Sequence, residues 1–383
     1  MTAITAQLPT PQVPTPFTAE DYRRRMNHAV DRAVESGLDG LIISPGPDLV
    51  WLTGYQPSAI TERLTLLFLV PGLPPALLVP ALERRDVEAA PGAACLEIID
   101  WLDATNPYQL ATMLLRPNGR FGISDSAWSV HLLEMHGESP TVRFCPLSLR
   151  VPMLRAVKDD NELARLAMAG ASADEAARAI LRLRFTGRRE RDIAADLAEL
   201  LYDFGHERAE FTMVAAGANS ADPVHEAGDR VIRPGDTVLM DFGGTMHGYG
   251  SDMTRTVCVR RPDPEVVRVH EVVRSAQEAA FRAVRPGMRC EEIDGVARAV
   301  IAESGYGEYF VHHTGHGIGV STHEQPYLVE GERQSLQPGM CFSIEPGIYL
   351  PRRFGVRIED IVTVTDTGGL RLNNADRDLF VVE

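Results

Sequence analysis

The sequence predicts an α+β protein in two parts, a small α/β domain followed by a larger domain built from two related halves. Three observations predict this arrangement. The chain has 383 residues, more than one compact core usually supports. Short apolar runs alternate with turn signals before residue 150, which is typical of a small α/β domain. After that point, a set of helices, turns and strands occurs twice.

The composition excludes several classes of partner. Hydrophobic residues make up 44% of the chain and charged residues 24%, as in ordinary globular proteins. The formal net charge of -15 repels nucleic acid and anionic membrane surfaces, so we expect neither as a partner. The first residues lack a basic stretch followed by an apolar run, and prolines interrupt the most apolar region, 64–82, so we expect neither a signal peptide nor a membrane span. Five scattered cysteines predict reduced thiols and a cytoplasmic location.

The first domain is expected over residues 17–153. Before it, residues 1–16 are rich in Pro and Thr without periodicity, which predicts a mobile tail. Thr18, with Asp21 three residues later, predicts the start of a helix that runs to about Gly37. The later elements expected are strands at 41–43, 50–52, 64–70 and 76–79, and helices near Arg84 and Tyr108. A mixed run at 151–158 marks the boundary.

Residues 154–383 form the second expected domain, and its helices come in two pairs. Apolar residues recur at helical spacing over 163–181 and 193–204, and again over 266–284 and 293–301. Glycines follow three of these segments where a helix would end, at Gly205, Gly287 and Gly305. The repeated pair indicates a duplicated architecture.

The strand regions repeat in step with the helices. A triplet that contains a histidine is followed by a Pro-Gly turn and a strand that ends in a carboxylate. This strand ends at Asp241 in the first half and at Glu345 in the second. A second carboxylate then opens a β-branched run, Asp252 in the first half and Glu359 in the second. The histidines of the two triplets are His225 and His323. Two halves that face each other would gather four carboxylates at the centre.

Asp241 and Asp252 are joined by a glycine-rich segment, 242–251, that suits a hairpin between antiparallel strands. The two carboxylates would then be cross-strand neighbours. Buried carboxylates placed together repel each other unless a cation lies between them, so the pattern favours a metal site. The alternative is that both aspartates cap their own backbone in the turn.

His316 lies between glycines, which would let backbone and a bound group approach closely. An imidazole presented there can bind a metal. The alternative is a surface or satisfied core histidine. The letters Gly-His-Gly-Ile-Gly at 315–319 also loosely resemble a dinucleotide-binding loop, but no helix pattern follows and Pro326 interrupts the segment.

Two glutamates complete the set of candidate ligands. Glu345 ends an apolar strand before a Pro-Gly turn and therefore needs a partner, which could instead be an arginine. Glu359 is expected on the same strand face as Arg357, because alternate residues point the same way. The alternative is a plain ion pair, and we interpret Arg357 as the partner that lies beside a metal ligand.

These residues together resemble the metal and histidine set of the pita-bread fold hydrolases, a family that includes methionine aminopeptidase, aminopeptidase P, prolidase and creatinase. The resemblance spans about Leu154 to the C-terminus, and the preceding domain resembles the creatinase-type N-terminal domain. Methionine aminopeptidases usually lack that large domain, and creatinases lack the full metal set. The resemblance therefore favours an Xaa-Pro peptidase, either a prolidase or an aminopeptidase P.

The resemblance implies two divalent metal ions, Mn(II) or Co(II) with Zn(II) as an option. Asp252 and Glu359 would bridge the ions, Asp241 would complete one, and His316 with Glu345 would complete the other. A bridging hydroxide would attack the Xaa-Pro carbonyl, and Glu345 would pass a proton to the proline nitrogen. The residues that would hydrogen-bond the substrate and the oxyanion are His225 and His323.

Substrate binding is assigned to three further residues. His312 resembles a substrate-contacting histidine, and Arg357 is placed in the same group. Arg63 is the candidate ligand for the free carboxylate of an Xaa-Pro dipeptide, because arginine suits bidentate capture. The alternative for Arg63 is an ion pair with Glu62 or another surface acid.

We expect a dipeptide or short-peptide substrate and a homodimer. The sequence leaves open whether the chain is a dipeptidase or an aminopeptidase. Three other interpretations remain: a hydrolase of the same fold that acts on another small, non-proline amide, a binding module without catalysis, and a dinucleotide-dependent oxidoreductase.

Overall fold

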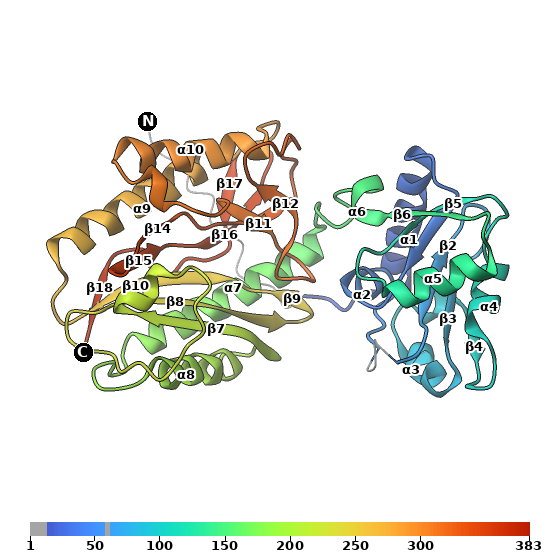
Figure 1. The fold of residues 1–383 in the computed structure, drawn as a ribbon, viewed down its shortest axis with the longest axis horizontal. Helices are drawn as coiled ribbons and strands as arrows, with labels where there is room; N and C mark the ends of the chain where they lie inside the picture. Colours follow the sequence, from blue (N-terminus) through green and yellow to red (C-terminus); the bar gives the residue numbers. More distant parts are fainter. Residues whose placement is uncertain (1–13, 58–61) are drawn as a thin grey trace. The chain divides into compact units, whose positions relative to one another are not determined.

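The structure is a computed structural model that describes residues 14–57 and 62–383 (Figure 1). The chain divides into an N-terminal unit, Thr15–Arg155, and a C-terminal unit that contains Ala156–Glu383. Most of the tail expected over residues 1–16 lies outside the described residues. In the described ranges, no helix combines the length and the apolar character that a membrane span requires.

The N-terminal unit is built on a mixed sheet. Its strands are β1 (Gly40–Ile43), β2 (Leu66–Leu69), β3 (Ala76–Pro80), β4 (Glu97–Trp101), β5 (Arg120–Ile123) and β6 (Arg143–Pro146). They lie in the order β4-β3-β2-β1-β5-β6. Strand β2 is antiparallel to β1 and β3, whereas the other neighbouring pairs are parallel.

Helices accompany this sheet. They are α1 (Ala19–Glu35), α2 (Pro47–Thr53), α3 (Arg84–Ala89), α4 (Pro107–Met113), α5 (Ser129–Glu138) and α6 (Leu147–Arg150), with short 3-10 turns η1 (Ala81–Glu83) and η2 (Ala93–Cys95). The predicted start of α1 is confirmed, because Thr18 and Asp21 form a reciprocal capping box. The strand predicted over 50–52 is wrong. Those residues lie in α2, where Pro47 occupies the first turn, and a short apolar run does not distinguish a strand from a buried helix.

The C-terminal unit has the two helix pairs that the periodicity predicted. They are α7 (Asp160–Ile180) with α8 (Glu190–Asp203), and α9 (Pro264–Ala283) with α10 (Cys290–Glu303), together with the turns η3 (Gly217–Ala221) and η4 (Gly307–Tyr309). Figure 1 shows the strands of this unit between the two pairs. Helices α7 and α8 contact the strands of the first half, and α9 and α10 contact those of the second.

Each half of this unit contributes one sheet. The first half has β7 (Arg208–Ala216), β8 (Thr237–Met246), β9 (Tyr249–Gly250), β10 (Met253–Val259) and β18 (Phe380–Val382), in the order β18-β10-β8-β7, with β9 beside β8. The second half has β11 (Gly315–Gly317), β12 (Glu324–Leu328), β13 (Cys341–Ile344), β16 (Asp360–Val364) and β17 (Gly369–Arg371), in the order β12-β11-β13-β16-β17. Strands β14 (Gly347–Leu350) and β15 (Phe354–Arg357) pair as a separate hairpin.

The duplication extends to the details of the backbone. Helices α8 and α10 are both 14 residues long, and they follow Arg189 and Arg289, whose backbone bridges to a later segment in each half. The turns before β8 and β13 both contain a glycine in the left-handed region, at Gly235 and Gly339. The two related halves predicted from the sequence are therefore present.

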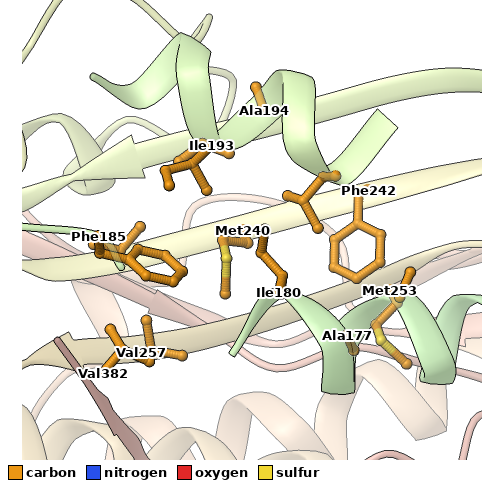
Figure 2. Close-up of a cluster of buried hydrophobic side chains, with 14 of the residues drawn as sticks. Ala177, Ile180, Phe185, Ile193, Ala194, Met240, Phe242, Met253, Val257 and Val382 are labelled. Carbon is orange, nitrogen blue, oxygen red and sulfur yellow. The ribbon is translucent and has the colours of Figure 1, made fainter. Parts of the chain in front are cut away.

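The core under α7 and α8 fixes the direction of the strand that carries Asp241. Met240 and Phe242 point into this core, where they meet Ile180 and Ile193 (Figure 2). Because successive side chains of a strand alternate, Asp241 points to the opposite face of the sheet. The hydrophobic pattern of β8 thus places the Asp241 carboxylate on the face of the sheet opposite the core under α7 and α8.

Candidate metal centre

Nearly all of the residues singled out in the sequence line one cavity of about 710 Å³ in the C-terminal unit. These cavity residues are Asp241, Asp252, His316, Glu345, Glu359, His225, His312, His323 and Arg357. Arg63 belongs to the N-terminal unit. There its guanidinium makes two hydrogen bonds to Asp103, at 3.0 and 3.2 Å, and an ion pair with Glu62 at 3.1 Å. The assignment of Arg63 to substrate binding stays a prediction.

The first pair of carboxylates lies on the predicted hairpin. Strands β8 and β10 are antiparallel, with Asp241 opposite Thr254, and Asp252 directly precedes β10. The glycines of the connection are not all turn residues. Gly243 lies within β8, where a Cβ atom would come within 2.1 Å of the carbonyl oxygen of Ser251. Close approach of the two strands therefore requires glycine at this position.

The second half brings a histidine and two glutamates to the same place. His316 lies in β11, and its Nδ1 atom is hydrogen-bonded to the carbonyl of Gly317 at 3.1 Å, so Nε2 faces the carboxylates. Nε2 lies 3.2 Å from Glu345 Oε1 and 3.5 Å from Asp252 Oδ2. Asp252, His316 and Glu359 each offer a ligand atom, and these atoms lie within 4.8 Å of one another.

The electrostatics of the cluster call for a cation. Burial, together with the neighbouring Asp241 carboxylate, raises the pKa of Asp252 well above its usual range. Burial and the charge of Asp252 do the same to the pKa of Glu359. Burial alone would lower the pKa of His316, but its contacts with Glu345 and Asp252 raise that pKa to about 9. A cation between these buried carboxylates would relieve their mutual repulsion.

One further observation tests whether these residues fit a metal. The Oδ1 atom of Asp241 is buried and has no hydrogen-bond partner among the described residues. A buried carboxylate oxygen rarely stays unpaired, because its desolvation is costly. Four carboxylates and one imidazole, without a thiolate, form a donor set that suits Mn(II), Co(II) or Zn(II). The arrangement therefore fits a cation between the two halves.

Arg357 braces the carboxylates in a way that the sequence only partly indicated. Its side chain donates to the carboxylate of Asp241, to Thr254 Oγ1 at 3.1 Å and to Tyr349 Oη at 2.8 Å. Thr254 in turn donates to Glu359 Oε2 at 2.6 Å. The predicted strand face shared by Arg357 and Glu359 is wrong, because β15 ends at Arg357 and Glu359 lies between two strands. Each guanidinium nitrogen already contacts a protein acceptor, which favours an orienting role.

The three other histidines surround the cluster. His323 stacks on His316, with ring centroids 3.8 Å apart. Nδ1 of His312 donates to the carbonyl of His313 at 2.7 Å, and its Nε2 accepts from Tyr349 Oη at 2.8 Å. Burial lowers the pKa of His312 to about 4, so its ring is neutral near pH 7. His225 contacts the buried carboxylate of Glu190 at 2.9 Å.

Sequence reasoning missed several residues that hold the site together. Thr254 and Tyr349 lie in β-rich segments where they read as ordinary strand residues, and Glu190 reads as an acidic residue in the first turn of a helix. Comparison of the two repeated halves could have pointed to Glu190. The related helix α10 begins with Cys290, so the carboxylate is specific to one half and needs a reason.

Comparison with known proteins decides the family. The sequence profile of metallopeptidase family M24 matches residues 164–366, which span the whole cluster. The chain belongs to this family. The profile of the creatinase/prolidase N-terminal domain matches residues 25–157. The predicted pita-bread and creatinase-type domains are thereby confirmed, and the dinucleotide-dependent oxidoreductase is excluded.

This M24 metallopeptidase has relatives along almost its full length. It is 42% identical over 370 residues to a probable dipeptidase PepE of Mycobacterium tuberculosis, covering 96% of this chain and 98% of the relative. It is 37% identical to an Xaa-Pro dipeptidase of Lactobacillus helveticus, covering 91% and 96%.

Solved structures of similar proteins show the same architecture. The crystal structure of dipeptidase PepE from Mycobacterium ulcerans matches with a TM-score of 0.91 and 41% identity, covering 96% of this chain and 100% of that one. A prolidase from Thermococcus sibiricus matches with a TM-score of 0.89 and 36% identity, covering 94% and 99%. The chain is therefore a metallopeptidase with the fold of dipeptidases, which removes the non-catalytic binding module.

Proposed function

We propose that this metallopeptidase hydrolyses the Xaa-Pro bond at the N-terminus of dipeptides or short peptides. The proposal rests on the cavity in which four carboxylates and His316 lie together. Among the described residues, the Oδ1 atom of Asp241 has no hydrogen-bond partner there. The similarity to proteins named Xaa-Pro dipeptidase and prolidase supports the substrate class.

Two divalent ions, Mn(II) or Co(II) with Zn(II) as an option, are proposed as the cofactor. Asp252 and Glu359 would bridge them, Asp241 would complete one coordination sphere, and His316 with Glu345 would complete the other. When bound, such a pair supplies a nucleophilic water at neutral pH and polarises the scissile carbonyl. Arg357 and Thr254 keep the carboxylates oriented, because both hold ligand oxygens by hydrogen bonds.

The remaining steps belong to side chains of the cavity. Glu345 would accept the proton that the attacking water loses and pass it to the proline nitrogen; its carboxylate lies beside His316 and accepts a hydrogen bond from Ser343 Oγ at 3.0 Å. His323 would donate a hydrogen bond to the carbonyl oxygen as negative charge develops on it, and His225 would hydrogen-bond the substrate. His312 would contact the substrate from the loop before β11. We further propose that the protein is a cytoplasmic homodimer. The five free cysteines support a reducing compartment and do not bear on the homodimer.

The test is release of free proline from Xaa-Pro dipeptides by purified protein. Chelated, metal-free enzyme should be inactive, and Mn(II) should restore turnover. Elemental analysis of the active protein should find about two ions per chain, as the bridging carboxylates imply. Active enzyme without divalent metal would overturn the proposal.

A second candidate is hydrolysis of dipeptides or small amides without proline. It is favoured by one observation, since the relative that is 42% identical is named a probable dipeptidase with no reference to proline. Matched Xaa-Pro and Xaa-Ala dipeptides separate the two. A kcat/KM for Xaa-Ala equal to or above that for Xaa-Pro would favour the second candidate.

A further inference from the structure

A buried glutamate at the start of α8 contacts one of the cavity histidines. Glu190 is fully buried, and its Oε2 atom lies 2.9 Å from Nε2 of His225. His225 lines the cavity and is partly exposed, with 19% of its side chain accessible. The carboxylate thus reaches the ring from the side of the protein and not from the side of the substrate.

The surroundings of Glu190 determine where the proton of the pair lies. Its Oε1 atom accepts hydrogen bonds from the backbone nitrogen of Ala216 at 2.7 Å and from Asn219 Nδ2 at 3.0 Å. Its Oε2 atom accepts from Asn219 Nδ2 at 3.2 Å and from the backbone nitrogen of Gly228 at 3.3 Å. Every one of these partners is a donor, so they favour an ionised carboxylate that only accepts.

Nε2 of His225 lies 2.9 Å from the acceptor Oε2 of Glu190 and 3.4 Å from the donor Nδ2 of Asn219, and the shorter contact favours a protonated Nε2 that donates to Glu190. The tautomer of a histidine is set by the hydrogen bond that one of its nitrogens makes, so the other nitrogen, Nδ1, is left without that proton. Nδ1 has no hydrogen-bond partner in the part of the chain that the structure describes. It is therefore the ring atom that remains for a ligand in the cavity.

The second half of the domain has no equivalent contact. His323, the related histidine, stacks on His316 instead. Helix α10 begins with Cys290 where α8 begins with Glu190. The capping box that stabilises each helix start is formed by Asp192 in α8 and Glu292 in α10, so it does not account for the buried carboxylate of Glu190.

We propose that Glu190 is a positioning residue, which holds the proton of His225 on Nε2 and directs Nδ1 to the substrate. The proposal rests on the proposed function for the step that His225 serves, but the position of the proton is a property of the enzyme alone. A carboxylate that orients an imidazole in this way keeps the tautomer needed for catalysis.

The position of the proton is measured directly in the wild-type enzyme. Two-bond 1H–15N correlation spectra of histidine-labelled, zinc-loaded protein show which ring nitrogen is protonated, and the His225→Gln variant identifies the resonance. We expect a protonated Nε2. A ring with an unprotonated Nε2 and the proton on Nδ1 would overturn the proposal, and this result does not depend on any Glu190 variant being stable.

The Glu190→Gln variant tests the consequence for catalysis. The amide can present a donor to His225 Nε2, which would move the ring proton to Nδ1. We expect kcat for Xaa-Pro dipeptides to fall about 10- to 100-fold, as when a group that orients a catalytic histidine is lost, with unchanged metal content and KM. Asp192→Asn is the matched control, because Asp192 lies in the same helical turn and caps Arg189 N at 3.0 Å. The control should keep wild-type kcat and the wild-type tautomer.

Two results separate the possible failures. A Glu190→Gln variant with lowered stability but wild-type kcat and tautomer would show that Glu190 is only structural, and the proposal would be wrong. If the wild-type enzyme releases no proline from any Xaa-Pro dipeptide, the proposed function fails, while the spectra still decide whether Glu190 sets the tautomer of His225.

Discussion

The two halves of the C-terminal unit use the same backbone plan but hold their histidines differently. In the first half, Glu190 at the start of α8 binds His225. In the second half, the buried carboxylate lies one helical turn further along, at Asp294 of α10, and binds the loop that carries His312. The repeat therefore specifies the positions of the candidate ligands, whereas the residues that hold the histidines differ between the two halves.

The halves also brace each other. Arg357, from the second half, holds Asp241 of the first, and Thr254, from the first half, holds Glu359 of the second. Arg255 donates from β10 to the backbone carbonyl of Glu359 at 2.7 Å. Neither half therefore forms the site alone, and a variant in one half tests how far that half depends on the other.

The largest effect is expected for a carboxylate between the halves. Asp252→Asn should abolish metal binding and turnover, because a neutral amide does not replace a bridging carboxylate. Metal content by elemental analysis and proline release are the two measurements. Asp366→Asn, an exposed aspartate in a turn of the second half, is the matched control and should behave as wild type. Wild-type metal content and rate in Asp252→Asn would refute the site assignment.

The candidate ligands singled out in the sequence line one cavity, and their positions could be found because they follow from periodicity and repetition. Asp252, Glu345 and Glu359 lie next to strand ends as predicted, whereas the predicted strand end at Asp241 is wrong, because β8 continues to Met246. Their partners were not visible, because hydrogen bonds such as Thr254 to Glu359 join residues more than one hundred positions apart. The error at α2 has a different cause, since a short buried run carries no period that separates helix from strand.

The next largest effect is expected for His323, the counterpart in the second half of the histidine that Glu190 contacts. His323→Ala should keep its metal, because His323 stacks on His316 and is not placed as a ligand. Turnover should fall by roughly 10²-fold, as when an oxyanion donor is removed. His225→Ala supplies the comparison in the other half. If His323→Ala left turnover unchanged, His323 would have no part in the mechanism.

A smaller effect is expected for recognition of the dipeptide's free carboxylate. Arg357 is not expected to bind it, because the nitrogens of Arg357 already contact protein acceptors. Arg63→Ala should raise KM for Xaa-Pro dipeptides roughly tenfold, as loss of a charge-assisted contact does, and leave Xaa-Pro-Xaa tripeptides unaffected. Asp103→Asn removes the ion-pair partner but keeps the cation, so its KM should not rise. Equal KM changes for both substrates in Arg63→Ala, or none, would leave Arg63 only as the partner in a surface ion pair.

The smallest effect is expected where the second half holds its own loop. Asp294 Oδ1 accepts from the backbone nitrogen and the hydroxyl of Thr314, at 3.0 and 2.8 Å, and its Oδ2 accepts from Arg298 Nε at 2.7 Å. Arg298 in turn donates to the carbonyl of His312, and Thr314 accepts from the backbone nitrogen of Glu345 at 2.8 Å. One carboxylate on α10 therefore fixes both the loop of His312 and the start of the segment that carries Glu345.

Asp294→Asn keeps the size of the side chain but removes the charge that holds Arg298. The loop should loosen while the ligands stay in place, because the metal cluster contacts neither Asp294 nor Arg298 directly. We expect KM to rise about 2- to 10-fold, as for loss of one hydrogen bond, with metal content unchanged and kcat nearly so. Glu292→Gln, which alters the capping box of the same helix and the ion pair with Arg289, should leave KM as in wild type. A fall in metal content in Asp294→Asn would mean that α10 supports the ligands and not the substrate loop, and the contrast drawn between the two helices would then be wrong.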